Sequence, residues 1–186
     1  MIVWINGAFG AGKSTTAGLL LESLEGARLF DPEYVGYLLQ RFVPVPTGDF
    51  QDLPLWRTLT VQTLAGLDRE HPGTWVVPMT LVNRGYRAEI HGGLRRLGHT
   101  LHHAVLVVPE PVLRERIDND ENDRSAREWR QDHVPSAMAE LPGLAGSEPD
   151  TYEIDATRAP DEVVADLLVH IGQTALHIGQ SQPAAR

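Results

Sequence analysis

The stretch Gly7-Ala8-Phe9-Gly10-Ala11-Gly12-Lys13-Ser14 matches the pattern G-x-x-x-x-G-K-[ST] at every position. Glycines let the backbone wrap closely around an anion, because no Cβ atom stands between the amide groups and the bound oxygen atoms. The apolar run Ile2–Ile5 precedes the stretch and a helical pattern follows it, which is the strand–loop–helix context of a phosphate-binding loop. The sequence therefore predicts a P-loop at residues 7–14.

Two side chains of this loop indicate its ligand. Lys13 is expected to reach the β- and γ-phosphates of a nucleoside triphosphate, and the Ser14 hydroxyl is expected to ligate Mg²⁺. The helix that begins there adds the positive end of its dipole. The residues expected to bind the nucleotide are Gly7, Ala8, Phe9, Gly10, Ala11, Gly12, Lys13, Ser14 and Thr15.

Short β-branched runs alternate with helical patterns along the chain, which predicts an α/β fold with a mainly parallel sheet. The expected strands are residues 2–5, 27–30, 75–79, 102–108 and 151–154. The expected helices are residues 13–24, 33–43, 53–68, 87–97, 111–118, 126–140 and 160–171. A single domain is expected at residues 1–174, with a small helical lid at about 114–135 and a flexible tail at 175–186.

The net charge and the composition limit the classes of molecule that the protein is expected to bind. The formal net charge of −9 disfavours nucleic acid or an anionic membrane surface and favours a small-molecule substrate. The absence of cysteine excludes a thiolate nucleophile or a cysteine-bound metal, and it fits a cytoplasmic protein. No apolar run approaches the roughly 20 residues of a membrane span. The oligomeric state, monomer or homodimer, stays open.

Several motifs in the first half of the chain occur together in one known family. They are Met1–Lys13, Phe30-Asp31-Pro32-Glu33, Asp49-Phe50-Gln51 with Leu55-Trp56-Arg57, and Val77-Pro78-Met79-Thr80. As a set they resemble the tunicamycin resistance proteins, and the second half is similar to P-loop kinases in general.

This resemblance implies a P-loop kinase-like three-layer sandwich with sheet order 2-3-1-4-5, ATP binding, and protection against a nucleoside-containing antibiotic. Family members associate peripherally with membranes through an amphipathic C-terminal segment. The tail of this chain is nearly uncharged, which does not favour membrane association.

Asp31 stands at the carboxyl end of the second predicted strand, where ligands of open α/β sheets bind. In small-molecule kinases that this layout resembles, an acid there takes or orients the proton of the acceptor hydroxyl. Asp31-Pro32 also suits a cap of the following helix, and the two roles can coexist.

Other residues are candidates for contact with the acceptor. Thr80 and Arg84 follow the third strand, and Trp56 and Arg57 lie between the second and third strands. Core packing or an ordinary polar loop are the alternatives for these residues. The third strand carries no carboxylate, which argues against a motor-type ATPase.

The lid candidate is rich in arginine. Arg116 and Arg124 are the residues expected to stabilise a transferring phosphoryl group, and the alternative is a solvated helix with exposed ion pairs. Arg158 follows the fifth strand, in a loop that resembles the adenine-contacting loop of related kinases; a plain strand-to-helix connection is the alternative.

His91, His102 and His103 are interpreted as surface or core histidines, because the sequence shows no carboxylate in register to complete a metal site. Two functions remain open. The first is an ATP- and Mg²⁺-dependent phosphotransferase acting on a small hydroxyl-bearing molecule. The second is an ATP-gated protein that sequesters an antibiotic without turnover.

Overall fold

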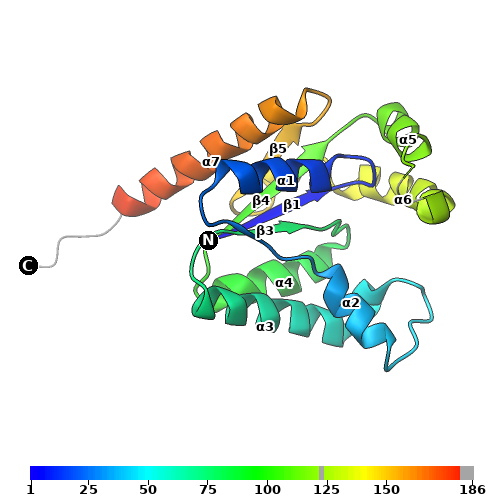
Figure 1. Cartoon of the computed structure of the whole chain (residues 1–186), viewed down its shortest axis with the longest axis horizontal. Coiled ribbons are helices and arrows are strands. Elements are labelled where there is room, and N and C mark those ends of the chain that lie inside the picture. The colour runs from blue at the N-terminus through cyan, green and yellow to red at the C-terminus, as the bar shows by residue number, and fades with distance from the viewer. Residues whose placement is uncertain (122–123, 181–186) are drawn as a thin grey trace, which may run out of the picture.

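In the part of the chain that the structure describes, five parallel strands form one sheet in the order β2-β3-β1-β4-β5 (Figure 1). The computed structural model describes residues 1–121 and 124–180, with side chains described up to residue 172. The strands are β1 (Ile2–Gly7), β2 (Arg28–Leu29), β3 (Trp75–Pro78), β4 (Leu101–Val107) and β5 (Thr151–Asp155). The observed order confirms the α/β fold and the strand order that the resemblance implied.

Helices cover both faces of the sheet, with α1 and α7 on one side and α3 and α4 on the other (Figure 1). The helices are α1 (Lys13–Ser23), α2 (Glu33–Gln40), α3 (Pro54–Glu70), α4 (Arg84–Arg96), α5 (Glu110–Asp118), α6 (Arg127–Glu140) and α7 (Pro160–Gln180). Short 3₁₀ turns are η1 (Phe50–Asp52), η2 (Arg124–Ala126) and η3 (Leu144–Gly146).

The central strand β1 shows why the sandwich has three layers. Val3 and Ile5 pack into the core on the side of α1 and α7, whereas Ile2 and Trp4 pack into the core on the side of α3 and α4. All four side chains are fully buried. A strand with two apolar faces requires a cover on each face, and here the two pairs of helices provide it.

Several element bounds differ from those expected. Helix α4 begins at Arg84 rather than Arg87, because Asn83 Oδ1 accepts hydrogen bonds from the amides of Gly85, at 2.8 Å, and Tyr86, at 3.2 Å. Strand β3 ends at Pro78, one residue before the expected end, although the amide of Met79 still donates a hydrogen bond to the carbonyl oxygen of Ile5 at 3.0 Å. Helix α7 continues past the expected end to Gln180, and residues 181–186 of the predicted tail lie outside the described residues.

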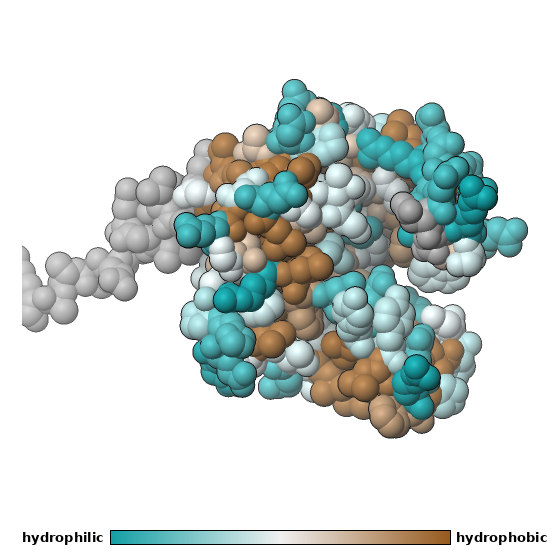
Figure 2. Space-filling view, in the orientation of Figure 1, coloured by the Kyte–Doolittle hydropathy of each residue, from teal (hydrophilic) through white to brown (hydrophobic). Residues whose placement is uncertain are grey.

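The predicted lid corresponds to α5, η2 and α6, apart from residues 122–123, which lie outside the described residues. These elements lie beyond the carboxyl end of β4, and the space-filling view shows a hollow between them and the region of α2 (Figure 2). Over the described part of the chain, none of the helices has the length and apolar character needed to span a membrane.

Candidate functional site

The P-loop joins β1 to α1 in a conformation that its glycines permit. Gly10 and Gly12 have φ angles of 80° and 95°, in the left-handed region that other residues rarely adopt. Gly10 packs so tightly against α5 that a Cβ atom would lie 2.8 Å from the carbonyl oxygen of Leu113. Gly12 caps α1 without a side-chain acceptor. The first-turn amides of α1 have no acceptor within the helix and face an incoming anion.

Lys13 folds back over this loop. Its Nζ atom donates hydrogen bonds to the carbonyl oxygens of Gly7, at 3.1 Å, and Ala8, at 3.0 Å, and it lies 5.3 Å from the ring centroid of Phe9. Burial, assisted by the charge of Arg130 and opposed by Glu33, lowers the pKa of Lys13 to about 7. The ammonium group has therefore lost water and gained neutral acceptors, a setting in which a phosphate group would stabilise its charge.

Two of the predicted arginines lie near the loop that follows β5. Arg116 donates from Nη2 to the carbonyl oxygen of Ala156, at 3.0 Å, and from Nη1 to that of Gly10, at 3.4 Å. It therefore ties the P-loop to the loop after β5. Arg158 is in that same loop, where its guanidinium group binds Asp166 on α7 at 2.6 Å.

The other lid arginines are placed differently from the expectation. Arg124 forms an ion pair with Glu121 at 3.2 Å, with 69% of its side chain exposed, so in this conformation it lies on the surface. Arg130, which the sequence did not single out, lies close enough to Lys13 to lower its pKa and binds Asp120 at 2.7 Å. The structure therefore brings Arg116 and Arg130 to the P-loop region.

Asp31 lies just beyond β2 and is half-buried. Its Oδ1 atom accepts a hydrogen bond from the amide of Glu33 at 2.9 Å, so it supports the start of α2 as the capping alternative requires. Burial raises the pKa of Asp31, although the bond from Glu33 opposes that rise. A carboxylate with a raised pKa is a stronger proton acceptor. Capping of α2 by Asp31 is therefore compatible with a role as the acceptor of a substrate proton.

A cavity of about 500 Å³ opens beside the P-loop. Five segments line it: the P-loop through Phe9, the segment before α3 through Asp49, Gln51 and Asp52, the connection from β3 to α4, the first turn of α4 through Arg84 and Tyr86, and α6. Cavities of this size typically hold small molecules. Its position next to the P-loop makes it the candidate acceptor site.

The predicted acceptor residues divide into lining and supporting residues. Thr80 and Arg84 line the cavity, and Thr80 Oγ1 donates a hydrogen bond to the carbonyl oxygen of Gly7 at 2.9 Å. Trp56 is fully buried, and its Nε1 donates to the carbonyl oxygen of Pro32 at 3.0 Å, so the core-packing alternative describes it. Arg57 binds Glu89 at 2.6 Å and stands behind the wall of the cavity.

An aromatic wall of the cavity was not predicted as a site. The ring centroids of Phe9 and Trp129 are 5.0 Å apart, and those of Trp129 and His133 are 4.1 Å apart. Trp129 and His133 are four residues apart on α6 and therefore share one face of that helix. This i, i+4 spacing of two rings beside the arginine-rich stretch is the signal that would have identified them.

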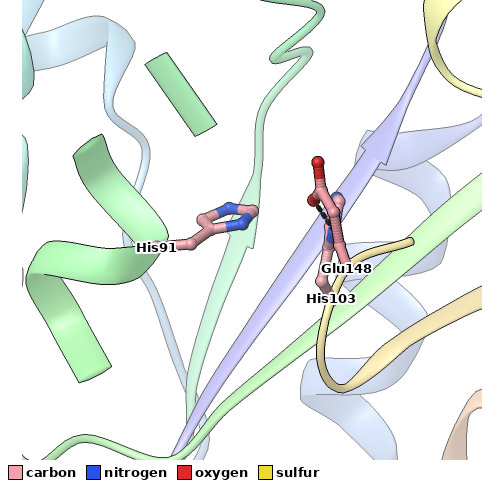
Figure 3. A group of neighbouring side chains, drawn as sticks. All are labelled: His91, His103 and Glu148. Atoms are coloured by element: carbon pink, nitrogen blue, oxygen red, sulfur yellow. Dashed lines mark ion pairs between the residues drawn. The ribbon is translucent and has the colours of Figure 1, made fainter. Parts of the chain in front are cut away.

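A buried polar cluster lies on the α4 side of the sheet (Figure 3). His91 of α4, His103 of β4 and Glu148, from the loop before β5, have potential ligand atoms within 4.8 Å of one another. Glu148 supplies the carboxylate that the sequence did not reveal. Burial lowers the pKa of both histidines, and Nε2 of His91 has no hydrogen-bond partner among the residues that the structure describes.

Hydrogen bonds define what this cluster does in the present structure. Asn6 Oδ1 accepts from the amides of Gly7 and Leu81, so its Nδ2 must be the atom that donates to Nε2 of His103, at 3.2 Å. Nδ1 of His103 therefore carries the proton and faces Glu148, at 3.6 Å, and Thr151, at 3.2 Å. A metal ion would have to displace one of these contacts.

Arg87 completes the cluster. Its Nε binds Glu148 at 2.9 Å, and its Nη1 donates to the carbonyl oxygens of Leu81 and Val82. The cluster therefore holds the connection from β3 to α4, which carries Thr80 and Arg84 into the cavity.

Comparison with known proteins agrees with this arrangement. A tunicamycin resistance protein from Deinococcus radiodurans is 27% identical, with a TM-score of 0.69, 92% of this chain covered and 95% of that chain. A gluconokinase from Sinorhizobium meliloti is 19% identical, with a TM-score of 0.70 and 97% of each chain covered. A sugar kinase from a Janibacter species is 21% identical, with a TM-score of 0.65, 92% of this chain covered and 94% of that chain. No curated protein matches the chain significantly.

The first of these similarities confirms the resemblance drawn from the motifs, and the other two show the fold alone. A family model described as AAA domain matches residues 2–141, which is well over half of the chain and includes the P-loop, the β3–α4 connection and α6. The chain therefore belongs to the AAA domain family and has the P-loop kinase-like fold.

Proposed function

We propose that this protein is an ATP- and Mg²⁺-dependent phosphotransferase that acts on a hydroxyl group of a small, nucleoside-like molecule and protects against an antibiotic of the tunicamycin type. The observation that carries the proposal is the cavity of about 500 Å³, which shares Phe9 with the P-loop. An acceptor in this cavity would lie next to the phosphates of ATP. Similarity to a protein named for tunicamycin resistance supports the substrate class.

In the proposed reaction, an acceptor hydroxyl oxygen forms a bond to the γ-phosphorus of ATP, and the bond from that phosphorus to the β–γ bridging oxygen breaks. ADP leaves, and Asp31 takes the hydroxyl proton. Since Asp31 stands outside the lining of the cavity, the reacting hydroxyl would extend from the cavity toward the carboxyl end of β2. Lys13 and the first-turn amides of α1 hold the phosphates, and Arg116 stabilises the transferring group from the α5 side.

The P-loop residues fit Mg-ATP. Lys13 contacts two backbone carbonyls rather than a carboxylate, and Gly12 leaves the first-turn amides of α1 without a side-chain acceptor. Ser14 would hold Mg²⁺, which supplies charge neutralisation between the phosphates when bound.

Substitution of Asp31 by asparagine is expected to lower the rate of phosphoryl transfer by about 100-fold or more, because the proton acceptor is lost while the hydrogen bond to Glu33 is kept. The rate of the wild-type enzyme should rise with pH through the raised pKa of Asp31 and then level off. The measurement is ADP release, with mass spectrometry of the acceptor to detect the gain of one phosphate group.

Asp49→Asn tests the alternative base, because Asp49 lines the cavity itself. Asp49 is also half-buried, its pKa is also raised by burial, and its Oδ1 accepts from the amide two residues ahead, that of Gln51, at 2.8 Å. Greater loss of transfer in Asp49→Asn than in Asp31→Asn would show that the base is assigned to the wrong carboxylate.

Sequestration without turnover is the second candidate, and the absence of a carboxylate in β3 favours it. In that case Asp31→Asn would keep antibiotic protection while Lys13→Ala would lose it. A candidate nucleoside antibiotic incubated with Mg-ATP would then show no mass gain.

A further inference from the structure

The charged groups around the acceptor cavity are mostly negative. Asp49, Asp52 and Glu140 line it, and among the described residues Arg84 is the one permanently cationic side chain in the lining. The lining also includes His133. A bound acceptor is therefore surrounded by an excess of carboxylates, which repel an anion and attract a cation.

The two carboxylates on η1 and beside it are held in place. Asp52 Oδ1 accepts a hydrogen bond from the hydroxyl of Tyr86 at 2.8 Å, and Asp49 Oδ1 accepts from the amide of Gln51. A carboxylate can accept several hydrogen bonds, so each keeps capacity for a hydroxyl or ammonium group of a ligand.

A second arginine lies nearby but does not neutralise this wall. Arg57 binds Glu89 at 2.6 Å and the carbonyl oxygen of Gln51 at 2.6 Å, and its guanidinium carbon lies 4.1 Å from the ring centroid of Tyr86. The ion pair with Glu89 compensates the charge of Arg57, and Arg57 stands outside the lining of the cavity.

The lining also contains aromatic rings from the P-loop and from α6. Trp129 is 41% exposed, and its ring centroid lies 5.0 Å from that of Phe9 and 4.1 Å from that of His133. An exposed indole ring that is held by two neighbours offers a preformed surface on which a planar ring of a ligand can stack.

We propose that the cavity selects acceptors by charge: it takes a neutral or cationic molecule with a planar ring, which stacks on Trp129 while hydroxyl or ammonium groups bind Asp49 and Asp52, and it rejects anionic acceptors. The inference rests on the proposed function for the identity of the cavity as the acceptor site. It distinguishes this chain from an enzyme for sugar acids or nucleoside monophosphates, whose substrates carry negative charge.

Three probes with the same ring and sugar test the proposal: uridine, 5′-amino-5′-deoxyuridine and uridine 5′-monophosphate. Their affinities for the intact chain are measured by calorimetry or ligand-observed NMR with Mg²⁺ and a non-hydrolysable ATP analogue present. We expect the amine to bind most tightly and the monophosphate at least tenfold more weakly than the amine. The ratio of the affinity for the amine to the affinity for the monophosphate should decrease as the salt concentration is raised, because exposed charges are screened.

Variants assign the effect to named residues. In Asp49→Asn and Asp52→Asn, which keep an oxygen acceptor, the ratio between amine and monophosphate should fall several-fold. Arg84→Ala should increase the same ratio, because it removes the cation in the lining. Trp129→Ala should weaken all three probes by a similar factor.

The proposal is overturned if the monophosphate binds as tightly as uridine, if none of the three probes binds, or if Asp49→Asn and Asp52→Asn together leave the ratio unchanged. These outcomes are independent of turnover. If the charge order holds but no phosphate is transferred, the proposed function fails and the selectivity stands. If anionic acceptors are phosphorylated as readily as neutral ones, the function stands and the selectivity fails.

Discussion

Replacement of Lys13 by alanine is expected to raise the Kd for Mg-ATP by about 100-fold, because a charge-assisted contact with the phosphates, worth about 2–3 kcal/mol, is lost. Phosphoryl transfer should fall below detection. The protein should stay folded, since within the described part of the chain the Nζ atom contacts backbone carbonyls, at 3.0 and 3.1 Å, and a ring face. Calorimetry measures the affinity, and thermal unfolding confirms that the variant is folded.

The pH dependence of ATP affinity is a second test of the role of Lys13 in ATP binding. With a pKa of about 7 in the nucleotide-free protein, Lys13 loses its proton as the pH rises above 7. A bound phosphate raises this pKa, so binding takes up a proton, and the affinity should fall by up to about tenfold per pH unit above 7. The Lys13→Ala variant should lack this slope. An equal slope in both proteins would contradict the assignment.

The second large effect is expected from Arg87→Met, which should reduce the free energy of unfolding by about 3 kcal/mol. The substitution leaves the carboxylate of Glu148 in the polar cluster without its guanidinium partner, and a partly buried charge without a partner is costly. It also removes the donor to the carbonyl oxygens of Leu81 and Val82. Urea denaturation at pH 7 measures the change.

Arg95→Met is the control for this prediction, because Arg95 lies on the same helix and binds the neighbouring Asp150 at 3.7 Å, with 29% of its side chain exposed. We expect that variant to lose less than about 1 kcal/mol. Adding Glu148→Gln to Arg87→Met should recover part of the loss. If Arg87→Met lowers the free energy of unfolding no more than Arg95→Met does, the cluster does not hold the β3–α4 connection as described.

Glu148 also makes the folding stability of the protein depend on pH. Burial alone would raise its pKa, but hydrogen bonds with His103 and Arg87 bring the pKa down to about 2, from 4.5. A carboxylate with a lowered folded-state pKa contributes its stability above the unfolded value and loses it as the pH falls. The wild-type stability should therefore decrease between pH 4.5 and 2.

The sequence predicted most of the fold because its signals are local. The P-loop pattern and the apolar run before it identified β1, the loop and α1. The alternation of elements predicted a mainly parallel sheet, and the family resemblance implied the three layers and the strand order. The early start of α4 was missed, because the sequence analysis did not identify Asn83 as the cap of that helix. Its two hydrogen bonds to the first turn decide that boundary.

The candidate site was less predictable, because it depends on which residues the fold brings together. Glu148 reaches His103 from a loop that no spacing rule connects to β4. Arg130 rather than Arg124 lies near Lys13, because the choice depends on where α6 begins and which face it turns inward. Charge patterns identify an arginine-rich segment but not its orientation.

The most direct test of the account is a calorimetric titration of the intact chain with ATP, ADP and AMP in the presence of Mg²⁺. A P-loop holds chiefly the β- and γ-phosphates, so ATP and ADP should bind and AMP should bind at least about 100-fold more weakly. Absence of measurable ATP binding, or AMP affinity equal to that of ADP, would contradict the account.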